Sequence, residues 1–121
     1  MSKTILCVDD SASMRQTIKL TLAVNGYRIV EAVDGVDGLD KAGNQAVDLV
    51  ITDLNMPRMD GLTFINQLRT QPAFKGVPIV FVTTETDAAK RAEAKAAGAT
   101  AWIAKPFAPD HLLKVVRRVL G

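Results

Sequence analysis

The sequence comprises 121 residues, of which 15 are basic and 13 are acidic, so its formal net charge at neutral pH is only +2. So weak a field gives no argument for a nucleic acid or an anionic membrane as the binding partner, and we expect neither. No apolar run is long enough to span a membrane, and the amino terminus lacks the features of a secretory signal. The single cysteine, Cys7, cannot form a disulfide within the chain, which fits a reducing cytoplasm.

The length suits one compact domain. The sequence contains no internal repeat, no low-complexity stretch and no Ser/Gly-rich linker, and its last apolar segment ends one residue before the carboxyl terminus. We therefore expect residues 1–121 to form a single domain with no output domain attached.

Five short apolar segments have the length and the β-branched composition of strands, and turn-forming residues bound them. In chain order they are Thr4–Val8, Tyr27–Glu31, Leu49–Thr52, Ile79–Thr83 and Thr100–Ala104. Their apolar residues run almost continuously rather than in alternation, which is typical of strands that are buried on both faces of a parallel sheet.

The segments between these strands have the spacing of amphipathic helices. Apolar residues recur at Met14, Ile18 and Leu22, at Leu62, Ile65 and Leu68, and at Leu112, Leu113, Val116 and Leu120, with an Ala-rich stretch over Ala88–Ala97 and a weaker pattern over 35–46. Three further signals mark helix ends: Gly26 and Gly98 as C′ glycines, Asp60-Gly61 as a turn and helix start, and Pro109 in a first helical turn.

The alternation of strands and helices predicts an α/β fold, with helices covering both faces of a parallel sheet. Periodicity leaves the order of the strands open. An open five-stranded sheet must reverse its winding at one point, and the ligand crevice of such a sheet lies at the carboxyl ends of the strands. The residues that follow each strand are therefore the candidates for a functional site.

Polar residues capable of chemistry stand at the ends of four strands. Asp9 and Asp10 follow the first strand, Asp53 the third and Lys105 the fifth, while Thr83 ends the fourth. Because parallel strands end at one edge of the sheet, we expect these five residues to lie together. A helix-capping or turn role is the alternative for each aspartate, and for Asp10 alone the two interpretations weigh evenly. The gathering of all five favours a site.

Three carboxylates at one edge repel one another, and such a cluster persists when a cation neutralises it or when one member is protonated. Only oxygen ligands are on offer, without His or Cys nearby in sequence, so Mg²⁺ fits better than zinc. The ammonium of Lys105 and the hydroxyl of Thr83 would complement phosphate oxygens held beside that ion. The constellation therefore favours phosphoryl chemistry.

Four separated motifs then reveal a resemblance. They are Val8-Asp9-Asp10 with Ser11–Arg15, Asp53-Leu54-Asn55-Met56-Pro57 with Arg58–Gly61, Val82-Thr83, and Lys105-Pro106-Phe107. With these motifs in this order, the chain resembles the receiver domains of bacterial response regulators, and among them the single-domain chemotaxis regulators. The resemblance implies a flavodoxin-like (βα)5 fold with strand order 2-1-3-4-5, and a cis peptide bond between Lys105 and Pro106.

The resemblance also implies a role for each residue at the sheet edge. Asp53 would be the phosphorylated residue. Asp10, Asp53 and the backbone carbonyl of Asn55 would bind Mg²⁺, Asp9 would support the ion through water, and Lys105 would pair with the phosphoryl group. Receivers take this group from a phosphohistidine of a kinase or from a small phosphodonor. Since a receiver catalyses only its own phosphorylation and dephosphorylation, we expect a signalling module and not an enzyme.

Switching and dephosphorylation would involve further positions. Thr83 would close over the phosphoryl group in the active state. Asn55 and Glu85 occupy the places where the family gates the attacking water, and they match the chemotaxis regulators, which implies a short-lived phosphoryl state. Where those regulators usually carry a switch tyrosine, this chain has Trp102, whose indole is larger and donates only through its ring N–H. A switching role and a plain edge-strand aromatic are equal alternatives for Trp102.

The implied partners are a histidine kinase of the CheA type and a downstream protein, with the flagellar motor switch as one candidate. The family uses the fourth helix, fifth strand and fifth helix as its output surface, and basic residues there either contribute to it or are simply solvated: Lys90, Arg91, Lys95, Arg117 and Arg118. His111 is expected to face solvent. We expect the protein to be a cytoplasmic monomer. The alternative function is a phosphate sink or a relay receiver that has no motor target.

Two other classes of protein fit less well. A Mg²⁺-dependent phosphatase with an aspartyl nucleophile needs a second acid two residues later, where this chain has Asn55. A dinucleotide-binding domain needs a Gly-rich turn after the first strand, and none is present there.

Overall fold

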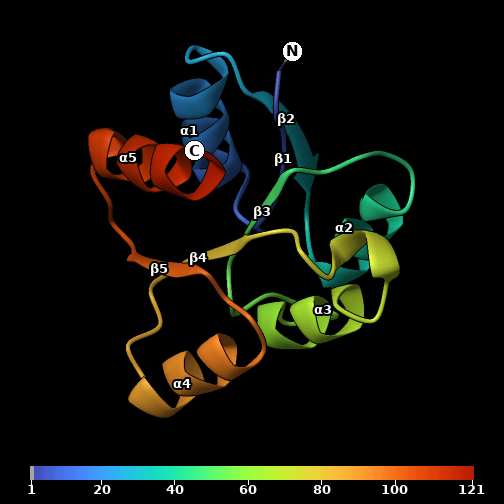
Figure 1. The fold of residues 1–121 in the computed structure, drawn as a ribbon. Helices are drawn as coiled ribbons and strands as arrows, with labels where there is room; N and C mark the ends of the chain where they lie inside the picture. The colour runs from blue at the N-terminus through green and yellow to red at the C-terminus, as the bar shows by residue number, and fades with distance from the viewer. Residues whose placement is uncertain (1) are drawn as a thin grey trace.

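The computed structural model describes residues 2–121 and confirms the α/β fold, with five parallel strands in the implied order β2-β1-β3-β4-β5 (Figure 1). The strands are β1 (Thr4–Val8), β2 (Arg28–Ala32), β3 (Leu49–Thr52), β4 (Ile79–Thr83) and β5 (Ala101–Ala104). The helices are α1 (Ala12–Ala23), α2 (Gly35–Ala42), α3 (Gly61–Leu68), α4 (Ala88–Ala96) and α5 (Pro109–Leu120), with a short 3₁₀ turn at Pro72–Phe74. The peptide bond between Lys105 and Pro106 is cis, as the resemblance implied.

Two hydrophobic cores lie on opposite faces of the sheet, because successive side chains of each strand point to opposite faces. Helices α1 and α5 cover one face, whereas α2, α3 and α4 cover the other (Figure 1). On β1, Ile5 and Cys7 contribute to the first core and Leu6 and Val8 to the second. The strands are therefore apolar at nearly every position, as their composition indicated.

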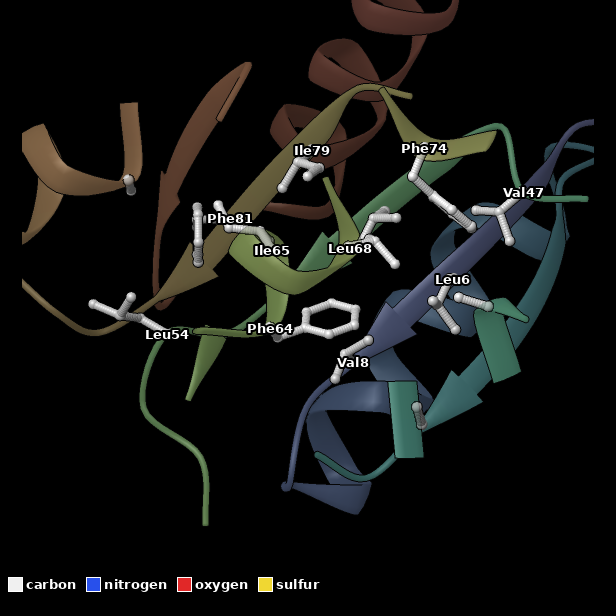
Figure 2. Close-up of a cluster of buried hydrophobic side chains, with 14 residues drawn as sticks. Leu6, Val8, Val47, Leu54, Phe64, Ile65, Leu68, Phe74, Ile79 and Phe81 are labelled. Atoms are coloured by element: carbon white, nitrogen blue, oxygen red, sulfur yellow. The ribbon is translucent and has the colours of Figure 1, made fainter. Parts of the chain in front are cut away.

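Figure 2 shows the second core, in which Phe64 and Leu68 of α3 lie against Leu6 and Val8 of β1. The ring of Phe64 is fully buried, and it also limits how closely α2 can approach: a Cβ added to Gly38 would lie 2.9 Å from it. Phe74, in the 3₁₀ turn before β4, fills this core near the amino-terminal end of the sheet. The sequence pattern did not indicate that turn.

The helix ends largely follow the sequence signals. The side chains of Ser11, Asp34, Asp60 and Asp87 accept N–H groups in the first turns of α1 to α4, and Pro109 begins α5. Asp60-Gly61 is thus a helix start, as predicted.

Gly26 and Gly98 both have positive φ and both end a helix. Each donates its N–H three residues back, and the next residue donates five residues back, which is the Schellman pattern. The strand predictions were wrong by one residue at three boundaries, because β2 runs from Arg28 to Ala32 instead of from Tyr27 to Glu31 and β5 starts at Ala101 instead of Thr100.

Cys7 is fully buried in the middle of β1. Burial, with the negative charges of Asp9 and Glu31, raises the pKa of its thiol to about 12. Within residues 2–121, no helix has both the length and the apolar character needed to cross a membrane.

Gly61 is the closest point between α3 and the end of β3. A Cβ at this position would lie 2.1 Å from the backbone oxygen of Asp53 and 3.0 Å from Cα of Leu54. Since backbone atoms cannot move aside as a flexible side chain can, Gly61→Ala is expected to lower the free energy of unfolding by about 2–3 kcal/mol, measured by urea denaturation.

Gly76→Ala is the matched control, because nothing lies within 4 Å of the added methyl group. Its free energy of unfolding is expected to stay within about 0.5 kcal/mol of the wild type or to rise slightly. Equal midpoints for the wild type and Gly61→Ala would contradict the packing argument.

Candidate functional site

Three aspartates meet at the carboxyl ends of two neighbouring strands. β1 and β3 pair with Val8 opposite Thr52, so Asp9 and Asp53 leave the sheet at the same level. The N–H of Asp53 donates to the Val8 carbonyl at 2.9 Å and fixes this alignment. One carboxylate oxygen from each of Asp9, Asp10 and Asp53 lies within 4.8 Å of the other two.

Lys105 follows β5, the edge strand of the sheet, and its side chain reaches this cluster. Its Nζ lies 2.8 Å from Oδ2 of Asp9 and 2.9 Å from Oδ2 of Asp53, and its side chain is only 10% exposed. The other carboxylate oxygens accept backbone N–H groups, from Ser11 at 2.9 Å and from Leu54 at 2.6 Å. The two buried carboxylates are therefore held in fixed orientations.

The charges in this cluster do not balance. Burial raises the pKa of Asp9 by more than the hydrogen bonds from Lys105 and Ser11 lower it. Burial also disfavours the charge on Lys105, but its hydrogen bonds to Asp9 and Asp53 and their charges raise its pKa overall. The two shifts have different causes, burial for Asp9 and the neighbouring carboxylates for Lys105, but in both cases three carboxylates surround a single ammonium. The site is therefore electrostatically suited to a further cation.

The donor set fits Mg²⁺, because it offers oxygen atoms alone. The capping alternative does not account for Asp10, since Ser11 caps α1 through its hydroxyl and Asp10 is exposed beside the cluster. Asp9 does make a local turn contact to the Ser11 N–H, so the alternative describes part of its role.

Asn55 and Glu85, each two residues beyond a site residue at the end of a strand, contact each other. The Asn55 amide donates to Oε1 of Glu85 at 3.3 Å, and Lys90 Nζ lies 3.2 Å from the same oxygen. The other oxygen accepts the N–H groups of Thr86 and Asp87. The hydrogen bond from Asn55 and the further donors lower the pKa of Glu85 to about 2, so this carboxylate is charged and restrained.

Thr83 is fully buried at the end of β4. Its hydroxyl accepts the N–H of Glu85 at 3.2 Å, and its carbonyl accepts the N–H of Lys105 at 2.9 Å. Since a hydroxyl can accept and donate at once, its hydrogen can still be given to a ligand.

Trp102 lies between the sheet and α4. Its ring centroid is 5.7 Å from that of Phe81, and the guanidinium carbon of Arg91 also lies 5.7 Å from it. The indole is only partly buried, and two shallow hollows flank it, one reaching Lys95 and Thr100 and the other reaching Glu85 and Ala104.

Several contacts around the site carried no signal that we recognised in the sequence. Arg15 donates to the carbonyl of Asp9 at 2.6 Å and pairs with Glu31, and Arg58 pairs with Asp34. Both arginines lie within the motifs quoted above, but the spacing of residues in the sequence did not predict which acidic residue each would contact. His111 is exposed, as expected, and so are the five basic residues of α4 and α5.

Comparison with known proteins agrees with this geometry. The sequence of residues 5–117 matches the family model that describes the response regulator receiver domain. Chemotaxis protein CheY1 of Helicobacter pylori is 41% identical over 119 residues, which cover 97% of this chain and 96% of that protein. The crystal structure of CheY4 of Vibrio cholerae aligns with a TM-score of 0.95 and 45% identity, over 99% of this chain and 100% of that one.

A third relative carries a metal. The receiver domain of a sensor histidine kinase from Pseudomonas aeruginosa, described with a magnesium ion coordinated in its active site cleft, has a TM-score of 0.91 and 28% identity. That alignment covers 100% of this chain and 99% of the other.

The chain therefore belongs to the response regulator receiver family. Within it, the chain is similar to the CheY proteins of bacterial chemotaxis, so it is a signalling module of a two-component system and not a catalytic enzyme. Membership implies a histidine kinase partner and a downstream target. The resemblance noted in the sequence is confirmed at this level, while the roles of individual residues stay predictions.

The lowered pKa of Glu85 predicts a pH-dependent contribution to stability. The folded state holds the pKa near 2, below the ordinary value of 4.5, so the stabilisation is complete above pH 4.5 and is lost as the pH falls towards 2. We expect the difference in unfolding free energy between the wild type and Glu85→Gln to be constant near neutral pH and to shrink upon acidification, as followed by urea denaturation at several pH values.

Glu93→Gln serves as the control, because the Glu93 side chain is exposed and makes no hydrogen bond within residues 2–121. Its difference from the wild type should not change over the same pH range. Parallel pH profiles for the wild type and Glu85→Gln would disprove the assignment.

Proposed function

We propose that this protein is a cytoplasmic, single-domain response regulator that accepts a phosphoryl group on Asp53 from a phosphohistidine of a chemotaxis histidine kinase. The observation that carries the proposal is the position of the Lys105 ammonium, 2.8 Å from Asp9 and 2.9 Å from Asp53, with Asp10 beside them. An aspartyl phosphate is more anionic than an aspartate, and this arrangement supplies a positive group next to the reacting carboxylate.

In the proposed reaction, a carboxylate oxygen of Asp53 attacks phosphorus while the bond to the donor imidazole breaks. The imidazole nitrogen keeps the electron pair and is protonated by solvent. Lys105 then transfers its contact from the carboxylate to an oxygen of the phosphoryl group. Mg²⁺, held by Asp10, Asp53 and the backbone carbonyl of Asn55 with help from Asp9 through water, would neutralise the two anions as they approach.

We assign control of hydrolysis to Asn55 and Glu85. Their side chains meet 3.3 Å apart, two residues beyond Asp53 and Thr83, and in this proposal they restrict the approach of water to the aspartyl phosphate. Because Glu85 is anchored by backbone N–H groups and by Lys90, the pair forms a fixed polar gate. We propose that this gate sets a short phosphoryl lifetime, as suits a rapid behavioural signal.

The proposed switch runs from Thr83 to Trp102. The free hydrogen of the Thr83 hydroxyl would bond to the phosphoryl group and draw in the end of β4. Phe81, two residues earlier on β4, contacts the indole of Trp102 on β5, so a shift of β4 would reach that ring. We propose that the surface formed by α4, β5 and α5 then changes its affinity for a target protein.

We propose the flagellar motor switch as the target, since the similar proteins include several CheY proteins of chemotaxis. One observation favours a second candidate, a phosphate sink or relay receiver that has no motor target. Trp102 stands in place of the usual tyrosine and contacts both Phe81 and Arg91, which differs from a phenol that is free to turn inward.

Phosphorylation itself is tested by intact-protein mass spectrometry after incubation with acetyl phosphate. The wild type is expected to gain the mass of one phosphoryl group in the presence of Mg²⁺ and none in EDTA, and Asp53→Asn should gain none. The control is Asp60→Asn in the same loop, which keeps the cap of α3 because Asn caps a helix as well as Asp. An adduct on Asp53→Asn would place the reaction elsewhere and sink the proposal.

The switch is tested by the fluorescence of Trp102, the single tryptophan of the chain. Phosphorylation of the wild type should change its emission, and Thr83→Ala should be phosphorylated without that change. Thr84→Ala is the matched control, because Thr84 is the exposed neighbour and should respond as the wild type does. A full emission change in Thr83→Ala would remove Thr83 from the switch.

A further inference from the structure

The loop of residues 54–60 follows Asp53 directly and carries Asn55. At its base, the Gly61 N–H donates to the Leu54 carbonyl at 2.7 Å and closes the loop. Six residues thus bulge from the sheet edge beside the acidic cluster. A loop of this kind needs a second attachment if Asn55 is to hold one position.

Arg58, near the tip of the loop, has an unusual backbone conformation. It is the one non-glycine residue within 2–121 that has a positive φ, 66°, and the Met59 N–H donates across it to the Pro57 carbonyl at 2.7 Å. Such a conformation costs free energy in any residue that has a Cβ, and it persists only when the surroundings enforce it.

The enforcing contact is a bidentate ion pair with Asp34. Arg58 Nε lies 2.6 Å from Oδ2 of Asp34, and Nη2 lies 3.1 Å from Oδ1. The carboxylate is 6% exposed, although the arginine side chain is 58% exposed. The hydrogen bonds and charge of Arg58 lower the pKa of Asp34, so the pair is ionised.

Asp34 is itself a fixed point, because it caps α2. Its Oδ1 accepts the N–H of Asp37 at 2.9 Å. The next residue, Gly35, touches the loop directly, since a Cβ there would lie 2.8 Å from the Met59 side chain. Through Asp34, Arg58 therefore attaches the loop of residues 54–60 to the first turn of α2.

We propose that the Arg58–Asp34 pair is a positioning device for the phosphoryl-transfer site, which holds Asn55 in the geometry that cation binding requires. This inference rests on the proposed function, because it assumes that the acidic cluster binds Mg²⁺ with the Asn55 carbonyl. Neither residue touches the ion or the phosphoryl group in this account. Both act through the backbone of the loop.

Charge and positioning predict opposite effects of Arg58→Ala on Mg²⁺ affinity, so this variant separates the two explanations. Arg58→Ala removes a positive charge and leaves the Asp34 carboxylate unpaired near the acidic cluster, so simple attraction would tighten Mg²⁺ binding. Loss of positioning would weaken it. Alanine keeps a Cβ in the left-handed region, so the change reports the guanidinium and not the backbone.

The experiment is isothermal titration calorimetry, which measures the dissociation constant of Mg²⁺ from the unphosphorylated protein, with Mg²⁺ as the only ligand. We expect Arg58→Ala to bind about three- to tenfold more weakly than the wild type, at the low end for residues that orient metal ligands. Asp34→Ser, which can still cap α2 but cannot reach Arg58, should weaken binding similarly, and the double variant should be no worse than either one. Arg28→Ala, at an exposed arginine of β2 with no ion pair among residues 2–121, should bind as the wild type does.

A second readout is the rate of phosphorylation by acetyl phosphate as a function of Mg²⁺ concentration. In Arg58→Ala, the rate at saturating Mg²⁺ should approach that of the wild type, while the concentration for half-maximal rate rises. Unchanged or tighter Mg²⁺ binding by Arg58→Ala would overturn this inference alone. A wild type that binds no Mg²⁺ would overturn the proposed function and this inference with it.

Discussion

The repulsion among three carboxylates at one edge of the sheet is the constraint on which the rest of the site depends. A parallel sheet brings the ends of β1 and β3 to one level, and the bond between the Asp53 N–H and the Val8 carbonyl prevents the acids from separating. Lys105 offsets part of this charge from the end of β5. The remainder makes the edge an attractive place for a cation and for chemistry that a cation assists.

The fold class and the composition of this edge could be predicted from sequence because both depend on local pattern, whereas the strand order came only from the family resemblance. Strands that are buried on both faces, such as β1 and β4, are apolar except for one threonine each, and a charged residue directly after such a strand can only stand at the sheet edge. The two wrong strand starts have local causes as well. Tyr27 and Thr100 have strand-like side chains, but they lie just outside the ladders that begin at Arg28 and Ala101.

The contacts that support the site could not be predicted, because they join distant segments without a periodic signal. Arg58 and Asp34 are 24 positions apart, and Asn55 and Glu85 are 30 apart. Arg91 and Trp102 meet only after α4 has packed on β5. The family resemblance supplied roles for Asn55 and Glu85, yet it did not indicate that the two side chains bond to each other. Such pairs depend on the register of whole elements, which a single sequence does not reveal.

The buried thiol of Cys7 has a practical consequence for following this protein in solution. Its pKa near 12 and its complete burial leave almost no thiolate at neutral pH, and reagents that alkylate cysteine need an accessible thiolate. The folded wild-type chain is therefore not expected to react with such labels. A cysteine introduced on the exposed face of α4 would be the sole reactive group, so a fluorophore or spin label could be attached at one chosen point without first removing a residue from the core of the sheet.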